Sequence, residues 1–214
     1  MPYDSDVPAK SKKRAPGAGA PSRVIRTGAA GQPTLLVSST AQYDWLYNDQ
    51  GTGANMDLTI WRPHPSDSSW FIIGDYAQGN YSSPTGVSVI VKAINDDPAN
   101  PLIKLPRDYR EVWNDHGSGG DNDGSIWYPV PEDGYKPLGY VGQMGYSKPS
   151  IANFACIRQD LVTTTDAGVL IWNDQGSGAD KDVSLYAIVG VENAFAAQDG
   201  YQPFSGTVYK LKSS

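Results

Sequence analysis

Residues 172–186 read WNDQGSGADKDVSLY, and this stretch occurs twice more upstream without a gap. The earlier copies are YNDQGTGANMDLTIW at residues 47–61 and WNDHGSGGDNDGSIW at residues 113–127. Each copy has an aromatic residue, Asn-Asp, a Gly-(Ser/Thr)-Gly step, a second Asp, a Ser or Thr, an aliphatic residue and a final aromatic residue. Three copies of so long a pattern indicate a repeat architecture, which decides the fold.

The similarity extends beyond the motif on both sides. A leucine stands eleven residues before each leading aromatic residue, at Leu36, Leu102 and Leu161. A glycine, a tyrosine and a nearby proline follow each copy, with the tyrosines at Tyr81, Tyr146 and Tyr201. We therefore expect repeat units at residues 33–101, 102–160 and 161–214, each of roughly 60 residues.

Inside each copy the hydrophobic period is two, as in a β-strand. Leu58 and Ile60 fall on one face, and Asp57, Thr59 and Trp61 fall on the other. Each motif is therefore expected to form a β-hairpin with a glycine-rich tip, followed by one or two further strands. The 23 glycines and 16 prolines agree with short strands and turns rather than helices.

Three such units predict an all-β β-prism with internal pseudo-threefold symmetry, made of three sheets of about four strands. Each sheet would bury its apolar face against the other two around the axis. A β-trefoil has the same symmetry, but its units are shorter, at about 40–50 residues, and a propeller needs at least four blades.

The first 32 residues differ from the rest of the chain. They carry six basic and two acidic residues, which is a net charge of +4. Since the whole chain has a net charge of −6, residues 33–214 have a net charge of −10. We expect residues 1–32 to be a disordered basic tail, since they are rich in Ala, Gly, Pro, Ser and Lys. Lys12, Lys13 and Arg14 could form a nuclear address, but a solvated basic arm is the simpler interpretation.

The charge and the apolar runs restrict the partners and the location. An acidic body repels phosphate backbones, so nucleic acid is not expected as a partner. No apolar run approaches the roughly 18 residues of a transmembrane helix, and no signal peptide is expected at the start. These features predict a cytoplasmic or non-classically released protein.

No pattern in the chain indicates an enzyme. The motifs of zinc proteases, α/β-hydrolases and P-loop proteins do not occur. A single cysteine forbids an internal disulfide, and Cys156 falls at an expected core position. His116 stands where the other copies have Gln50 and Gln175, so the repeat does not require an imidazole. Paired carboxylates can hydrolyse glycosides, but an acid pair repeated on three loop tips is more typical of multivalent binding than of a single catalytic cleft.

The repeated motif resembles that of the vacuolar protein sorting-associated protein 62 family. It is also similar to the membrane-attack-complex-associated β-prism domains that end some pore-forming insecticidal proteins. The resemblance covers nearly all of residues 33–214. It implies a β-prism that attaches to membranes or glycans, with a sorting role in some members. Similarity to the toxin modules would make this chain a targeting module without a pore-forming domain.

The three loop tips are the candidate binding sites. They hold eight of the 21 acidic residues outside the tail, and their Gly-x-Gly steps allow positive φ and bare backbone amides. Oxygen ligands suit Ca²⁺, for which the candidate metal ligands are Asp49, Asp57, Asp115, Asp123, Asp174 and Asp182. The full set of candidate ligand-binding residues is Asn48, Asp49, Gly51, Gly53, Asp57, Trp61, Asn114, Asp115, Gly117, Gly119, Asp123, Trp127, Asn173, Asp174, Gly176, Gly178, Asp182 and Tyr186.

Three interpretations of these loops remain open. Asn, Asp, Gly and Ser are also what tight β-turns use, so the loops could be purely structural. Ca²⁺ or the carboxylates could bind sugar hydroxyls while the aromatic residue at position 61, 127 or 186 stacks on the sugar ring, although tryptophans at motif ends more often fill a core. Alternatively, the tips could contact a protein or a lipid headgroup. If the loops are structural, the chain would be an intracellular membrane-trafficking or protein-interaction module in which the tail or an edge strand carries the contact. The tyrosines after each motif are expected to be exposed and form a second candidate ring of binding residues.

Overall fold

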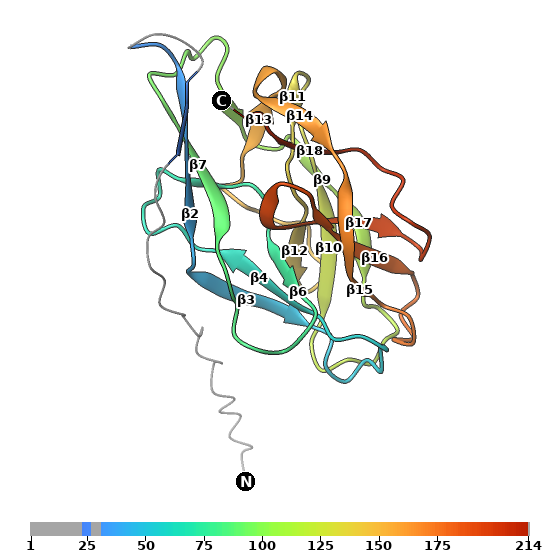
Figure 1. Cartoon of the computed structure of the whole chain (residues 1–214). Coiled ribbons are helices and arrows are strands. Elements are labelled where there is room, and N and C mark those ends of the chain that lie inside the picture. Colours follow the sequence, from blue (N-terminus) through green and yellow to red (C-terminus); the bar gives the residue numbers. More distant parts are fainter. Residues whose placement is uncertain (1–22, 27–30, 214) are drawn as a thin grey trace.

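The computed structural model describes residues 23–26 and 31–213 and shows an all-β chain (Figure 1). Most of the expected disordered tail lies outside the described residues. Its segment Arg23–Arg26 forms a strand that pairs with the strand Thr34–Thr40, so the prediction of disorder is wrong there. The strands are β1 Arg23–Arg26, β2 Thr34–Thr40, β3 Tyr43–Asn48, β4 Thr59–Pro63, β5 Phe71–Ile72, β6 Tyr76–Gln78, β7 Ser88–Ile94, β8 Ile103–Lys104, β9 Asp108–Asn114, β10 Gly124–Val130, β11 Tyr135–Lys136, β12 Val141–Met144, β13 Cys156–Arg158, β14 Val162–Thr165, β15 Ala167–Asn173, β16 Val183–Ile188, β17 Val191–Asp199 and β18 Val208–Leu211. The one described helix, Gln159–Leu161, is a single 3₁₀ turn, and no described helix has the length and apolarity to cross a bilayer.

Each repeated motif forms a β-hairpin that is completed by a third strand. The resulting antiparallel sheets are β3-β4-β6, β9-β10-β12 and β15-β16-β17. In each hairpin the residue before the leading aromatic residue is an extra residue on the first strand, at Leu46, Val112 and Ile171. A bulge of this kind increases local twist and redirects the neighbouring side chain. Its recurrence at one motif position shows that the three hairpins share one geometry.

The first and last strands of each unit pair separately from the hairpin. These pairs are β2-β7, β8-β13 and β14-β18, and β1, β5 and β11 extend two of them. The all-β prism expected from the repeats is confirmed, but the described strands form six small sheets rather than three four-stranded ones. In unit 1 the break falls at Ala41–Gln42, between the first strand and the hairpin.

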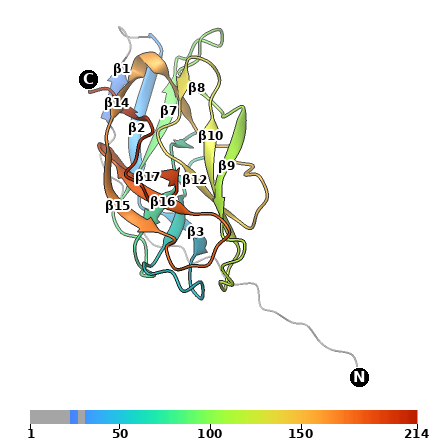
Figure 2. The same ribbon diagram turned by 90° about the vertical axis from the view of Figure 1, so that its right-hand side faces the viewer.

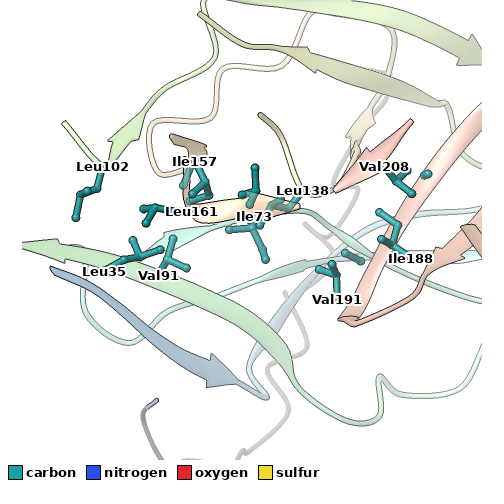
Figure 3. Packing of buried hydrophobic residues seen from close by; sticks show 14 residues of the cluster. Leu35, Ile73, Val91, Leu102, Leu138, Ile157, Leu161, Ile188, Val191 and Val208 are labelled. Carbon is teal, nitrogen blue, oxygen red and sulfur yellow. The ribbon is translucent and has the colours of Figure 1, made fainter. Parts of the chain in front are cut away.

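Two large clusters of buried side chains fill the prism. The first lies among the outer strand pairs and includes Leu35, Val91, Leu102 and Val208 (Figure 3). The second lies nearer the loop tips and contains the leading aromatic residues of all three motifs, Tyr47, Trp113 and Trp172. Trp113 packs edge-on against Trp172 at 5.6 Å between ring centroids and against Tyr47 at 6.2 Å. One aromatic residue from each unit thus builds the centre of the molecule.

Candidate functional site

The three Asp/Gly-rich tips meet at the lower end of the molecule in Figures 1 and 2. We call residues 48–57, 114–123 and 173–182 loops 1, 2 and 3. A backbone hydrogen bond joins each loop to the next. The bonds run from Asp121 N to Gln50 O at 2.8 Å, from Asp180 N to His116 O at 2.8 Å, and from Asn55 N to Gln175 O at 2.9 Å. Because donors and acceptors occupy the same motif positions each time, the loops close a cyclic ring.

Glycine makes this close approach possible. Gly51, Gly117 and Gly176 all have positive φ, of 84°, 87° and 93°, as the sequence predicts for the Gly-x-Gly steps. A Cβ atom on Gly51 would lie 2.7 Å from the Asp121 carboxylate of loop 2. The same atom on Gly117 would lie 2.7 Å from the Asp180 carboxylate of loop 3. At Gly51 and Gly117 a side chain would therefore collide with the neighbouring loop, whereas at Gly176 the nearest atom to an added Cβ, Asn55 Oδ1, would lie 3.2 Å away.

The first Asp of each loop is buried and structural. Asp49 is 2% exposed, and its Oδ1 accepts hydrogen bonds from Leu58 N and from the Tyr81 hydroxyl, each at 2.8 Å. Its Oδ2 accepts one from Trp172 Nε1 at 2.8 Å, across the boundary with unit 3. Burial raises the pKa of Asp49, although these donors oppose the shift. Its oxygens are thus already engaged within the protein.

The same arrangement recurs in loop 3 and is altered in loop 2. Asp174 accepts from Val183 N at 2.9 Å and from Trp113 Nε1 at 3.0 Å. Asp115 accepts from Gly124 N at 3.1 Å, but the aromatic residue at the third boundary is Tyr47. The Tyr47 hydroxyl is buried without a hydrogen-bond partner among the described residues, and burial and the charge of Asp115 raise its pKa.

The second Asp of each loop is exposed and lies beside a tyrosine of the turn that follows. Tyr146 donates to Asp123 Oδ1 at 3.1 Å, and Tyr201 donates to Asp182 Oδ1 at 3.0 Å. In unit 1 the equivalent Tyr81 hydroxyl donates to the buried Asp49. The three tyrosines are 41%, 36% and 37% exposed for Tyr81, Tyr146 and Tyr201, so the expectation that they are exposed is confirmed. Partial burial and the adjacent carboxylates raise the pKa of all three phenols.

Two of the aromatic residues that close the motifs lie in the core. Trp61 and Trp127 are each 6% exposed and belong to clusters of buried side chains, so neither ring can stack on a sugar from solvent. The core interpretation of these tryptophans is confirmed and their candidate stacking role is wrong, because both faces of the hairpin sheets are covered. Tyr186 is half-buried; its ring packs on Phe204 and its hydroxyl donates to Gln202 O.

The remaining predicted site residues shape the loops. Asn114 Oδ1 accepts from His116 N and Asn173 Oδ1 from Gln175 N, both two residues ahead, which is Asx-turn geometry. Asn48 contacts loop 2, since its Oδ1 accepts from Asn122 Nδ2 at 2.7 Å. Within the described chain, no group of three or more His, Cys, Asp or Glu residues is placed to hold a metal ion. Calcium binding therefore stays a prediction.

Beside loop 3 the surface is hollowed. An open depression of about 610 Å³ is lined by Val112, Asp180, Lys181, Asp182, Asp199 and Gly200. It lies at the boundary between units 2 and 3, where Lys181 Nζ also pairs with Glu111 at 2.6 Å. The sequence placed Asp180 and Asp182 on one loop, but it gave no sign that a strand of unit 2 would complete this surface. The ring bonds between loops were likewise not predicted, because they join residues of different units.

Comparisons with known proteins agree with this architecture. The family described as vacuolar protein sorting-associated protein 62 matches residues 6–201. Among solved structures, the chain is similar to GNIP1Aa from Chromobacterium piscinae, with 30% sequence identity and a TM-score of 0.68. The similarity covers 80% of this chain and 34% of that protein, so the chain spans about a third of its length. No curated protein matches.

Proposed function

We propose that this chain, which belongs to the vacuolar protein sorting-associated protein 62 family, is a non-catalytic recognition module that binds carbohydrate. The binding surface is the loop end of the β-prism. The observation that carries the proposal is the set of three exposed tyrosines, each hydrogen-bonded to an Asp of its own loop.

This pairing suits the chemistry of a sugar. A phenol ring offers an apolar face for the C–H side of a pyranose and a polar edge for hydrogen bonding. The exposed carboxylates of Asp57, Asp123 and Asp182 would accept hydrogen bonds from sugar hydroxyls. The buried carboxylate behind each pair holds the loop in place, so the site is already organised before a ligand arrives.

The pseudo-threefold symmetry adds multivalency. Three weak sites on one rigid end can bind a surface of repeated glycans with an avidity about 10²–10⁴ above that of a single site. The sites are not identical: His116 lies against the Tyr146 ring at 5.0 Å, where the other loops have glutamine. The open depression of about 610 Å³ also lies beside loop 3.

A glycan array probed with the full chain tests the proposal, with and without calcium chelator. We expect selective binding that falls when Tyr81, Tyr146 and Tyr201 are replaced together by Ala. The matched control is Tyr209→Ala, a half-buried tyrosine on β18, which should leave binding unchanged. Loss of binding with chelator would support calcium assistance, and indifference to chelator would remove the metal from the proposal. Absence of any glycan signal from the folded protein would contradict it.

A membrane-trafficking or protein-interaction module is the second candidate function. The description of the family supports it, as does the ring of bonds by which the loops hold one another. In that case the loops are structural and the contact lies elsewhere on the prism. Flotation of the chain with lipid vesicles, unaffected by the three tyrosine substitutions, would favour this candidate over the carbohydrate proposal.

A further inference from the structure

The first strands of the three units are equivalent, but their outer edges are not. β2, β8 and β14 each pair on one side with the last strand of their own unit. On the other side, β2 also pairs with β1, antiparallel, from Arg23 opposite Val37 to Arg26 opposite Thr34. Within residues 23–26 and 31–213, neither β8 nor β14 has a strand at this position.

The edge of β14 is the longer of the two free edges, with four residues against two in β8. Lys212 N donates to Leu161 O, and this pair continues the β14-β18 register. Antiparallel ladders alternate, so residues 163 and 165 bond toward β18, while the carbonyl oxygen of Val162 and both backbone groups of Thr164 point outward. The Val162 N–H donates to Gln159 O in the 3₁₀ turn that precedes the strand. No backbone bond of the described chain engages Thr164 on that side, and Thr163 and Thr164 have exposed side chains.

The strand that continues this edge lacks the usual protection. Edge strands commonly carry charged side chains that discourage pairing with another chain. On β15, Val169 is 76% exposed, whereas the equivalent residues of the other two units are Asp44 and Arg110. Leu170 is also exposed, at 39%. Unit 3 therefore presents an unpaired strand edge and, beside it, an exposed valine where units 1 and 2 have charged residues.

We propose that the outer edge of β14 is a docking site for an extended strand of a partner protein. That partner strand carries β-branched residues flanked by basic ones. The model for this occupant is β1, whose sequence Arg-Val-Ile-Arg pairs with the equivalent edge of unit 1. Strand addition of this kind draws affinity from main-chain hydrogen bonds, and side chains give specificity. The charge of −10 on residues 33–214 favours a basic strand over an acidic one. The site is separate from the loops and does not depend on carbohydrate binding.

The test uses the full chain and a synthetic peptide with the sequence of residues 21–29, PSRVIRTGA, titrated by calorimetry. We expect binding that Thr164→Pro weakens about tenfold or more, because proline removes an outward N–H and its ladder bond. The matched control Thr164→Val keeps the backbone donor and should bind like the unaltered chain. A peptide with Glu in place of both arginines should bind about tenfold more weakly.

Amide exchange on the unaltered chain, followed residue by residue by NMR, gives a readout that does not require the proline variant to fold. The peptide should slow exchange at Thr164, whose N–H points outward, whereas the Val162 N–H is already bonded to Gln159 O. Slowing at Thr34–Thr40 or at Ile103–Lys104 instead would overturn the assignment to β14. The proposal would also fail if Thr164→Pro bound the peptide unchanged, if no peptide bound, or if the edge instead paired two copies of the chain.

Discussion

At the scale of single residues, the first and the last Asp of each loop have different roles. The first is buried and accepts a backbone hydrogen bond, and in loops 1 and 3 it also accepts one from a tryptophan of the neighbouring unit. The last is exposed beside a tyrosine. Identical residue types in one short motif therefore divide into a structural and a surface group. The glycines of the loops differ in the same way. An added Cβ atom on Gly51 would collide with the next loop, whereas one on Gly119 would meet nothing within 4 Å.

Asp49→Asn should destabilise the fold by about 1–3 kcal/mol, because the amide would turn a donor toward Trp172 Nε1 or Leu58 N. Chemical denaturation at pH 7 measures the change. The control is Asp57→Asn, an exposed position in the same loop, which should stay within about 0.5 kcal/mol of the original. Equal effects at the two positions would refute the division between buried and exposed carboxylates.

Gly51→Ala should cost more stability than Gly119→Ala. Both glycines have positive φ, so each substitution carries about 1–2 kcal/mol of backbone strain. Only at Gly51 would the new Cβ also lie within 3.0 Å of Asp121, whereas nothing lies within 4 Å of it at Gly119. Thermal denaturation of the two variants compares them directly, and a Gly119 variant that is as unstable as the Gly51 variant would contradict the ring of loops.

At the scale of elements, a buried ion pair links two units. Arg62 on β4 donates to Asp75 Oδ2 at 2.9 Å and to Gly142 O on β12 at 2.7 Å. Asp75 is fully buried, and it also accepts from Gly142 N. The ion pair therefore links the hairpin of unit 1 to β12, the strand that completes the hairpin sheet of unit 2. Burial raises the pKa of Asp75, and the guanidinium opposes that shift.

Arg62→Met should destabilise the protein by about 3–5 kcal/mol at neutral pH, since it leaves an uncompensated buried carboxylate. Without Arg62 the pKa of Asp75 rises further, so the folded state holds its proton more tightly than the unfolded chain. The loss of stability should then shrink at acidic pH and grow as pH rises through the folded pKa. Denaturation at several pH values measures this.

The control for that experiment is Lys148→Met. Lys148 pairs with Asp108 at 2.6 Å, but both side chains are more than half exposed, so the pair should contribute at most about 1 kcal/mol. A stability deficit of Arg62→Met that did not change with pH would show that Asp75 does not carry the effect.

At the scale of the whole molecule, the ring of loops and the central aromatic cluster both need all three units. Each unit supplies one ring donor, one ring acceptor and one central aromatic residue. A unit alone leaves these groups without partners and exposes the apolar side of its hairpin. The three repeats are therefore expected to fold as one cooperative body rather than as independent modules.

Deletion of residues 161–214 should abolish folding rather than leave a stable two-unit fragment. The deletion removes Trp172, which donates to Asp49, and Asp174, which accepts from Trp113. Near-ultraviolet circular dichroism and dispersion of amide NMR signals report the loss of fixed packing. A truncated chain that unfolds cooperatively would show that the units are independent.

From the sequence we predicted the strand period, the three hairpins, the pseudo-threefold prism and the positive φ of the Gly-x-Gly steps. These follow from local patterns that are repeated, and a repeated local pattern imposes a repeated local geometry. The sequence also indicated that Tyr81, Tyr146 and Tyr201 would be exposed.

The three-dimensional structure was needed to show which carboxylate of each loop is buried, where Trp61 and Trp127 lie, and how the loops bond to one another. A period of two shows which side chains share a face, but it does not show whether the opposite face is covered. That depends on side chains from another unit, more than 50 residues away in the sequence. Burial and cross-unit hydrogen bonds are therefore properties of the assembled prism, and no single motif contains them.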